Sequence, residues 1–352
     1  MLALLLVVPG APTARAAVGE ADYQRLATGL TEQVALPAVA AFEAATAAFA
    51  GTMKEFCAAP ESADAVVVEG GFAAVMLAWQ RVLPLDFGPL RKGDGPSRFQ
   101  YWPDRRGTGG RQLARVLKDR DEAMLEPASL AGKSVALVDL QALERLLFED
   151  DGPVDPFRCG YAAAIAAVQA ERAAAMAADW AGPDGQAAAM RTASQGNDLY
   201  YEAAEAARDY LGALTHGLQR IVEARLTPVL GDAPATARPR AAESWRSGLS
   251  TANILANLDT LEALLTDPDG FAALAKAAGD PLIGRTIASM IGEARQTLES
   301  LPVPLAEAAQ DPELHPKLTH TADLLHRAHW LTEHTLAATV GLTAGFNASD
   351  GD

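Results

Sequence analysis

The chain has 352 residues, of which 49% are hydrophobic and 21% are charged, and this composition excludes a disordered chain. Its formal net charge of −16 excludes functions that depend on attraction to nucleic-acid phosphates or to anionic lipid surfaces, whereas a cationic partner or a bound metal cation is compatible with it. The length predicts two domains or one elongated helical body.

Residues 1–17 have the pattern of an export signal. A short apolar run over residues 1–8 is followed by helix-breaking residues and by Ala-Arg-Ala at positions 14–16, the small-x-small pattern at which signal peptidases cut. We therefore expect cleavage near Ala16 or Ala17. The run is too short to span a bilayer, and we expect no membrane span in the rest of the chain.

The rest of the first half is predicted to be helical, with one long interruption. Apolar residues recur at three- and four-residue spacing, and abundant alanine favours helix because it loses no side-chain entropy there. Pro37 is expected to kink or split the first helix. The predicted helices cover residues 20–56, 62–82, 110–125, 129–148 and 155–181.

Residues 84–111 form this interruption. They are rich in proline and glycine and carry the aromatic residues Phe87, Phe99, Tyr101 and Trp102. An irregular segment of this length inside a helical protein is usually functional or well packed. Its aromatic residues, which lie next to arginines in the sequence, indicate good packing at least.

A change in composition at residues 182–185 marks a candidate domain boundary. No strand-like alternation of useful length occurs on either side of it. We therefore predict an all-α fold, with one unit at residues 18–185 and a second at residues 186–352. The helices predicted in the second unit cover residues 197–226, 240–265, 268–278, 282–300 and 314–345.

A carboxylate on an apolar helix face is the first candidate functional feature. The helix predicted over residues 134–148 is apolar nearly all round, which is typical of a buried helix, yet it carries Asp139, Gln141 and Glu144. Gln141 and Glu144 are three residues apart and share a face, where an unpaired carboxylate is costly. Two interpretations remain open: a polar pocket inside a bundle, or a buried ion pair between Glu144 and an arginine.

The same stretch resembles the signature of the imelysin-like family. That family carries a Gly-x-His-x-x-Glu motif in a helix of the form Gly-x-His-Ala-Ile-Glu-x-Leu-Leu. Residues 139–147 match it with Glu144 in place, but Asp139 stands at the glycine position and Gln141 at the histidine position. Further stretches match one branch of the family in the same order along the chain. They are Phe56-Cys57, Arg98-Phe99-Gln100-Tyr101-Trp102-Pro103-Asp104, Arg158-Cys159 and Trp245-Arg246-Ser247-Gly248-Leu249-Ser250.

The resemblance implies two helical bundles packed together in an exported protein of the bacterial cell envelope, located in the periplasm. It also implies a loose link to iron or haem uptake. We expect a ligand pocket centred on Glu144 between the two halves of the chain, where arginine side chains would pair with the carboxylate. The expected ligand-binding residues are Arg98, Trp102, Asp104, Arg105, Asp139, Gln141, Glu144, Arg246, Ser247 and Ser250.

The family motif is interpreted as a metal site because His and Glu at positions i and i+3 can hold a divalent cation together. Gln141 weakens that interpretation here, since an amide oxygen cannot replace imidazole as a ligand for a transition metal. It also argues against the metallopeptidase activity once assigned to the family. The cofactor is unknown, with iron or another divalent metal as the candidates.

A second metal candidate lies near the C-terminus. His326, His329 and Glu333 are spaced by three and four residues, with Asp323 three residues before His326, so they can share one helix face. The alternative is a set of partly exposed surface histidines.

Two cysteines, Cys57 and Cys159, complete the candidate features. An even count in an exported protein indicates one disulfide, and the alternative is two buried free thiols.

Three functions follow from these features. The first is a binding or accessory protein of the imelysin-like type, with an unknown ligand or envelope protein as partner. The second is a metallopeptidase, and the third is a structural or adaptor protein. Neither a phosphate-binding loop nor a Gly-x-Ser-x-Gly nucleophile motif occurs in the sequence, and Gln141 makes us favour the first function over the second.

Overall fold

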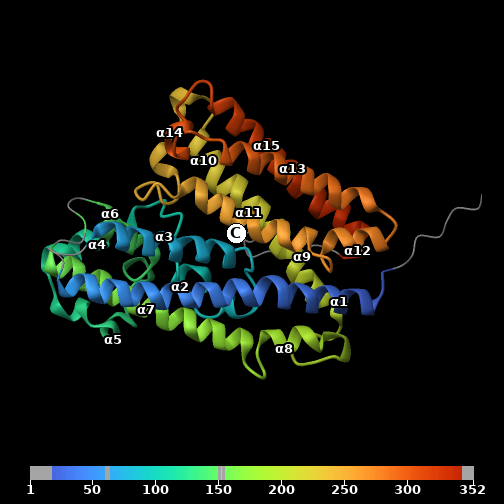
Figure 1. Cartoon of the computed structure of the whole chain (residues 1–352), viewed down its shortest axis with the longest axis horizontal. Helices are drawn as coiled ribbons and strands as arrows, with labels where there is room; N and C mark the ends of the chain where they lie inside the picture. Colours follow the sequence, from blue (N-terminus) through green and yellow to red (C-terminus); the bar gives the residue numbers. More distant parts are fainter. Residues whose placement is uncertain (1–17, 60–63, 150–151, 153–154, 343–352) are drawn as a thin grey trace, which may run out of the picture.

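The computed structural model describes residues 18–59, 64–149, 152 and 155–342, and over these residues it contains helices and no strand. The all-α prediction is therefore confirmed. The expected export signal at residues 1–17 lies outside the described residues. Two helical bundles pack together (Figure 1).

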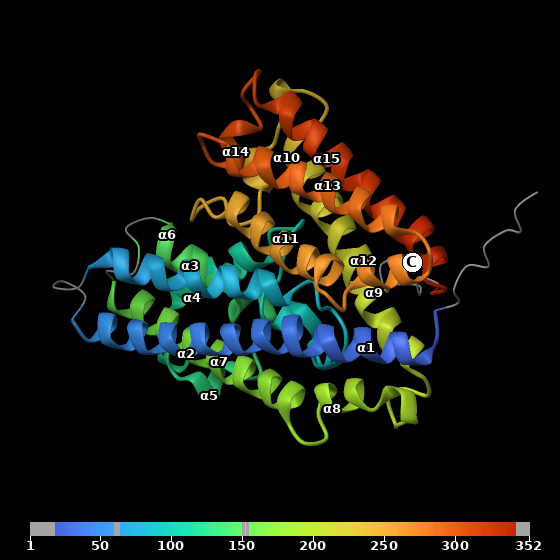
Figure 2. The same ribbon diagram turned by 45° about the vertical axis from the view of Figure 1, so that its right-hand side comes forward.

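The first bundle is arranged around one long helix. Helices α3 and α7 pack along α2, and the shorter helices α4, α5 and α6 cover the end of the pair formed by α2 and α7 (Figures 1 and 2). The helices of this part are α1 (Glu20–Leu30), α2 (Leu36–Ala58), α3 (Ala65–Val82), α4 (Thr108–Asp119), α5 (Pro127–Leu130), α6 (Leu140–Phe148) and α7 (Pro156–Ala181).

In the second bundle α11 lies between α9 and α13, and α15 packs against both α9 and α13. Gly217 lets α9 approach α11 closely, because a Cβ at this position would lie 2.5 Å from the side chain of Leu261. The second half of the chain begins with α8 (Gln186–Arg191), which packs against α1 and α7. The helices that follow are α9 (Ala203–Arg220), α10 (Thr227–Leu230), α11 (Ser250–Thr266), α12 (Phe271–Ala277), α13 (Pro281–Glu299), α14 (Leu305–Ala308), α15 (His315–Trp330) and α16 (Ala337–Thr339).

Pro37 does not end the first helix. It lacks an N–H group for the carbonyl four residues earlier, and the helix continues through one π-helical turn, η1 (Thr31–Ala35), which joins α1 to α2. Such a turn keeps the axis continuous while it accommodates a defect in the hydrogen-bond ladder. The resulting rod carries α1 beyond the first bundle, where α1 packs against α8 and α9. The division of the chain at residue 185 stays a prediction.

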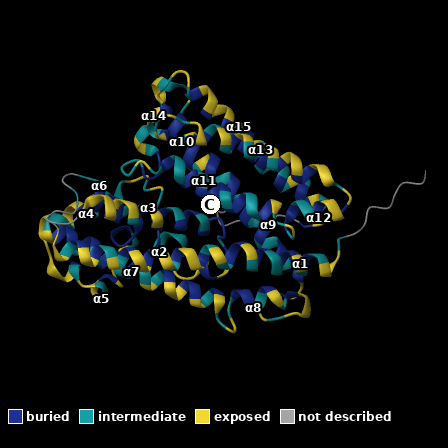
Figure 3. Cartoon of the chain, viewed as in Figure 1, coloured by how far each residue is buried: buried dark blue, intermediate teal, exposed yellow. Residues whose placement is uncertain are grey.

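Two helical stretches, Glu20–Ala58 and Ala65–Val82, are long and apolar enough to cross a membrane, by length and composition alone. A core helix of a bundle meets the same criteria. Both stretches supply core residues, since Phe42, Phe72 and Trp79 are fully buried. Buried residues face the interior of each bundle and exposed residues its outer surface (Figure 3).

The irregular segment at residues 84–111 is well packed. Phe99 is fully buried between the rings of Phe42 and Trp79, with centroid distances of 5.3 and 4.9 Å. Gln169 and Arg172 of α7 both donate to the carbonyl oxygen of Arg98 and so fix the segment to the first bundle.

The helix expected over residues 129–148 is interrupted. The chain instead forms α5, a short 3₁₀ turn η5 (Val135–Leu137) and α6. Asp139 explains the late start of α6, because its carboxylate accepts from the backbone N–H of Ala142 and makes Asp139 the N-cap of the helix. Arg158 of α7 satisfies the other end of α6 by donating to the carbonyl oxygens of Arg145, Leu146 and Glu149.

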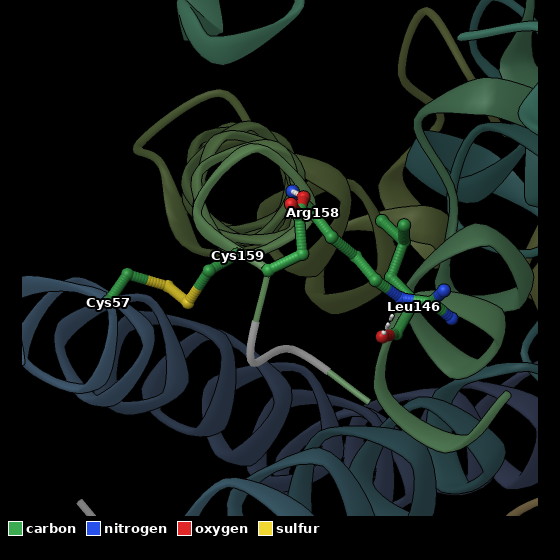
Figure 4. The surroundings of a disulfide bond; sticks show 5 residues. Cys57, Leu146, Arg158 and Cys159 are labelled. Atoms are coloured by element: carbon green, nitrogen blue, oxygen red, sulfur yellow. Dashed lines mark hydrogen bonds between the residues drawn. A yellow bond between two sulfur atoms is a disulfide. The ribbon is translucent and has the colours of Figure 1, made fainter. Parts of the chain in front are cut away.

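The disulfide is confirmed. Cys57 at the end of α2 is bonded to Cys159 near the start of α7, with 5.6 Å between their Cα atoms (Figure 4). The neighbouring Arg158 side chain points away from the disulfide, toward Leu146 of α6 (Figure 4). The matched pair Arg158-Cys159 therefore ties α7 to α6 through one residue and to α2 through the next.

Removal of the disulfide should destabilise the protein substantially. The bond joins residues separated by 102 positions, so a Cys57→Ala, Cys159→Ala double variant should lose on the order of 4 kcal/mol of unfolding free energy in the chain-entropy model. Urea denaturation of both proteins measures this loss. Thiol titration of the unreduced, unfolded wild type should find no free thiol, and two reactive thiols would contradict the pairing.

Candidate functional site

Glu144 of α6 is the centre of a buried polar cluster that joins the two bundles. Its side chain is fully buried, and Oε1 accepts from the backbone N–H groups of Arg246 and Ser247, at 3.1 and 3.0 Å, and from Ser247 Oγ at 2.9 Å. Ser244 has a left-handed backbone, with φ of 51°, in the turn just before these donors. This turn replaces the first part of the helix expected over residues 240–265.

The expected hydroxyl contact from Ser247 is present, but the arginine partners of Glu144 differ from those expected. Of the three arginines proposed, only Arg246 contacts Glu144, and it does so through its backbone N–H rather than its guanidinium. The guanidinium of Arg246 pairs with Glu149 and lies 4.4 Å from the centre of the Trp245 ring. Arg98 donates to the carbonyl oxygens of Pro89 and Lys92.

The remaining predicted residues separate into structural and groove positions. Asp104 accepts from the N–H groups of Thr108 and Gly109 at the start of α4, and Ser250 Oγ donates to the carbonyl oxygen of Glu243. Trp102 and Arg105 line an open hollow described below.

Asp139 and Gln141 lie beside Glu144 on α6 with different roles. The second carboxylate oxygen of Asp139 accepts from the N–H of Tyr101 at 2.6 Å, so Asp139 holds the irregular segment against the N-terminus of α6. In the described part of the chain, Nε2 of Gln141 and Oε2 of Glu144 are buried without hydrogen-bond partners.

Burial dominates the electrostatics of these carboxyl groups. It raises the pKa of Asp139 to about 7, against the opposing effect of the N–H donors of Tyr101 and Ala142. Burial likewise raises the pKa of Glu144, and the hydrogen bonds from Ser247 oppose that shift.

A metal ion does not fit the motif position in this chain. Oε1 of Glu144 already receives three donors, so only the buried Oε2 of this carboxylate lacks a partner in the described structure. Both oxygens of the neighbouring Asp139 carboxylate accept backbone N–H groups, and the position that the family fills with histidine holds the amide of Gln141. Across residues 18–59, 64–149, 152 and 155–342, no group of three or more His, Cys, Asp or Glu side chains is arranged to hold a metal.

The C-terminal histidines do not form such a group either. His329 contacts the carbonyl oxygen of Thr215 through Nδ1 at 3.1 Å and Glu333 through Nε2 at 3.4 Å. His326 is exposed, with its ring centroid 6.3 Å from that of His329. One ring nitrogen of His329 is thus directed at the protein backbone. The other contacts Glu333, and these two side chains alone are too few to hold a metal ion.

A second buried cluster, centred on Arg225, was not predicted. The Arg225 and Glu243 side chains are 2% and 1% exposed, and they form a two-point ion pair with N–O distances of 2.9 and 3.2 Å. Gln80 of α3 accepts from Arg225 Nη2 at 2.9 Å and donates to Glu243 Oε1 at 3.1 Å. Asn253 of α11 also donates to Glu243.

Pro228 explains how Arg225 reaches this interior position. The helix predicted over residues 197–226 continues through a π-helical turn, η8 (Ile221–Leu226), into α10. The turn accommodates Pro228, which cannot donate to the carbonyl of residue 224. Turns of this kind re-aim side chains and are frequent at functional sites. Two features of the sequence could have indicated this cluster. Arg225 lies in a largely apolar run three residues before Pro228, and Glu243 lies two residues before Trp245.

Two adjoining hollows lie beside this cluster, with volumes of about 360 and 440 Å³, within the range of small-molecule sites. They share Leu83, Asp86, Arg91, His216 and Arg220. We call the pair the interface groove, which runs between residues 83–105 and the surface of α9 and η8. Its charged or aromatic lining residues are Asp86, Phe87, Arg91, Trp102, Arg105, Arg208, Asp209, His216, Arg220, Glu223, Arg225 and Glu243.

The walls of the groove are ordered by ion pairs. Asp86 bridges Arg91 and Arg220, at 3.1 and 2.9 Å. The Arg225 guanidinium lies 5.4 Å from the centre of the Trp102 ring. Glu144 does not line either hollow, so the motif carboxylate is closed off while Arg225 lies at the edge of an open space.

Known proteins share both sequence features and fold with the chain. The imelysin (peptidase M75) family model matches residues 35–329. An imelysin-like protein from Psychrobacter arcticum 273-4 superposes with a TM-score of 0.78 at 20% identity, covering 94% of this chain and 99% of that one. A Parabacteroides distasonis ATCC 8503 protein, provisionally named iron-regulated protein A precursor, superposes with a TM-score of 0.74 at 15% identity, covering 90% and 95%. At these identities the structures show the fold alone. No curated protein matches the chain.

We expect Glu144 to act as a tie between the bundles. A Glu144→Leu variant would leave the partly buried N–H groups of Arg246 and Ser247 without their acceptor, while Ser247 Oγ keeps the carbonyl oxygen of Ser244. The variant should lose about 3–5 kcal/mol of unfolding free energy. Glu144→Gln keeps an acceptor oxygen and should lose less. The matched control is Gln141→Leu, one turn away on the same helix, whose Nε2 has no partner to lose among the described residues. Equal stability of Glu144→Leu and this control in urea denaturation would rule out the tie.

Asp139 should make stability depend on pH. Because the folded state binds its proton more tightly than the unfolded chain does, unfolding free energy should fall as pH rises from about 4 to about 7, by up to about 4 kcal/mol from this group. Asp139→Asn should reduce the dependence of unfolding free energy on pH. The dependence that remains should come from Glu144, whose pKa is also raised by burial. Asp64→Asn, at the exposed N-cap of α3, is the control. Denaturation at several pH values measures both slopes, and parallel curves for wild type and Asp139→Asn would contradict the assignment.

Proposed function

Because the chain belongs to the imelysin family, we propose that it is an exported, non-catalytic binding protein of the cell envelope whose ligand occupies the interface groove. One observation carries this proposal. The groove is an open hollow of small-molecule size between the two bundles, and it has a buried, hydrogen-bonded polar cluster at its edge. Clefts with a few convergent polar groups are the usual form of a binding site.

The proposed export to the periplasm is supported by the expected signal at residues 1–17. The disulfide between Cys57 and Cys159 supports an oxidising compartment. The name of the Parabacteroides protein, a precursor, agrees with export within this fold.

An accessory role in iron uptake is supported by that protein's name, iron-regulated protein A precursor. The described residues present no group of three metal-ligating side chains. We therefore propose that this chain serves such a role through a bound small molecule or a partner protein, and not by holding a bare iron ion.

Peptidase activity is the alternative that the family designation suggests. Hydrolysis by a metal-bound water requires an open coordination position and a general base. In this chain the histidine position is Gln141, and Glu144 is closed off by Ser247 and Arg246. These contacts support a binding function over hydrolysis.

We expect no chelator-sensitive proteolysis. Purified mature protein, incubated with casein and a peptide library in the presence of added zinc or iron, should cleave no faster than a buffer control. Cleavage that disappears with a chelator and with Glu144→Gln would establish the peptidase instead.

Occupancy of the groove is tested with a filled variant. Ala224 of η8 lines the groove, and Ala224→Trp should fill it. A panel of anionic, neutral and cationic small molecules should include at least one class that raises the melting temperature of the wild type, since a ligand at 100 times its Kd adds about 2.7 kcal/mol. The rise should be absent in Ala224→Trp and present in Val66→Trp, a change at an exposed site on α3. No stabilisation by any class would favour a structural or adaptor role.

A further inference from the structure

We infer that the interface groove binds small oxyanions, molecules that bear carboxylate or phosphate groups, with Arg225 and Arg220 as the residues that contact the anion. This inference rests on the proposed binding function and names the chemical class of its ligand. It is carried by an unsatisfied buried donor, by a surplus of arginine over its nearest carboxylate, and by the shape of the space beside them.

The unsatisfied donor is Nη1 of Arg225. The side chain is 2% exposed, its Nε and Nη2 are bonded to Glu243 and Gln80, and Nη1 has no hydrogen-bond partner among the described residues. A buried donor left without an acceptor costs free energy, more so when it is charged. Since Arg225 lines the groove, an oxygen of a bound anion is the acceptor that this position accommodates.

The direction of approach is defined by the neighbours of Arg225. Trp102 lies over the guanidinium at 5.4 Å, while Glu243 and Gln80 occupy the edges formed by Nε and Nη2. The remaining edge, at Nη1, is buried and has no hydrogen-bond partner in the part of the chain that the structure describes. In-plane contact is the geometry by which arginine binds carboxylate and phosphate oxygens. Because the fork is already held by its partners, little side-chain entropy is lost when the anion binds.

Arg220 supplies the second positive charge. It shares the single carboxylate of Asp86 with Arg91, so two guanidinium groups face one carboxylate on this wall. The Arg220 side chain is 33% exposed and lines both hollows. A bound anion would therefore meet a wall with net positive charge in a protein whose formal net charge is −16.

The opposing carboxylates of the groove are mostly occupied. Glu243 is paired with Arg225. Asp209 accepts from the hydroxyl of Tyr200 at 2.6 Å, and burial raises the pKa of Asp209. Glu223 is an exposed residue of the rim that accepts from Gln219 at 3.2 Å. With Asp86 included, four acidic residues line the groove, and the five arginines exceed them by one. These arginines are Arg91, Arg105, Arg208, Arg220 and Arg225.

Titration calorimetry with probes sorted by charge tests the inference. The anionic probes are citrate and inorganic phosphate, which separate carboxylate from phosphate recognition. Triethyl citrate is the neutral probe of similar shape, and choline is the cationic one. We expect citrate or phosphate to bind, triethyl citrate and choline not to bind, and the affinity for the anion to fall as salt is added.

Variants assign the binding to the groove. Arg220→Gln should weaken anion binding at least tenfold, and Arg225→Lys, which keeps the charge and removes the fork, should weaken it as well. Arg115→Gln is the control, because Arg115 makes a surface ion pair on α4 and its side chain is 84% exposed. Melting curves report whether each variant is folded. If Arg225→Lys does not fold, Arg220→Gln alone tests whether the anion binds in the groove.

The outcomes separate this inference from the proposed function. Binding of triethyl citrate or choline without binding of either anion would overturn the anion inference and leave the binding function in place. Anion binding that Arg220→Gln and Arg115→Gln weaken equally would show general charge attraction and also overturn it. If no probe binds and the wider panel fails to stabilise the wild type, both proposals fall together.

Discussion

The buried pair of Arg225 and Glu243 is the interaction on which the arrangement of the two bundles depends. Neither charge can be buried alone without a large desolvation penalty, and removing one partner of such a pair is strongly destabilising. Their remaining hydrogen bonds come from Gln80 of α3 and Asn253 of α11, which belong to different bundles. The pair is therefore satisfied only when both bundles occupy this one relative position, and apolar packing alone would not impose such a restriction.

A second tie depends on backbone rather than side-chain chemistry. The N–H groups of Arg246 and Ser247 converge on Glu144, in the same turn that begins with Glu243 and Ser244. One short segment before α11 thus supplies Glu243 to the arginine cluster and its backbone donors to the motif glutamate. A shift of this segment would disturb both ties together, so the two clusters restrain the interface as a unit.

Local sequence signals predicted much of the fold and less of the site. Helical periodicity located most helices, and the two cysteines allowed only one intramolecular pair. Prolines were harder to interpret: Pro37 and Pro228 suggested breaks, yet tertiary packing carried both helices through π-turns. Burial of Glu144 was predictable from its apolar face, and Ser247 was among the residues expected at the site. The two backbone donors were not predictable, because any residue type supplies a backbone N–H group. Contacts such as Arg225 with Gln80, separated by 145 residues, left no local pattern.

Glu144 and Arg225 each have one buried polar atom without a hydrogen-bond partner in the described structure, and the two groups differ in whether they can lose their charge. Oε2 of Glu144 lacks a partner in the described structure, but a carboxyl group can accept a proton, and burial raises its pKa toward that neutral form. An arginine has no such route, because its guanidinium stays charged under all ordinary conditions. The orphan Nη1 of Arg225 must therefore be met by an acceptor from outside its cluster. This chemical asymmetry is the reason why the inferred anion is assigned to the groove beside Arg225 and not to the motif glutamate.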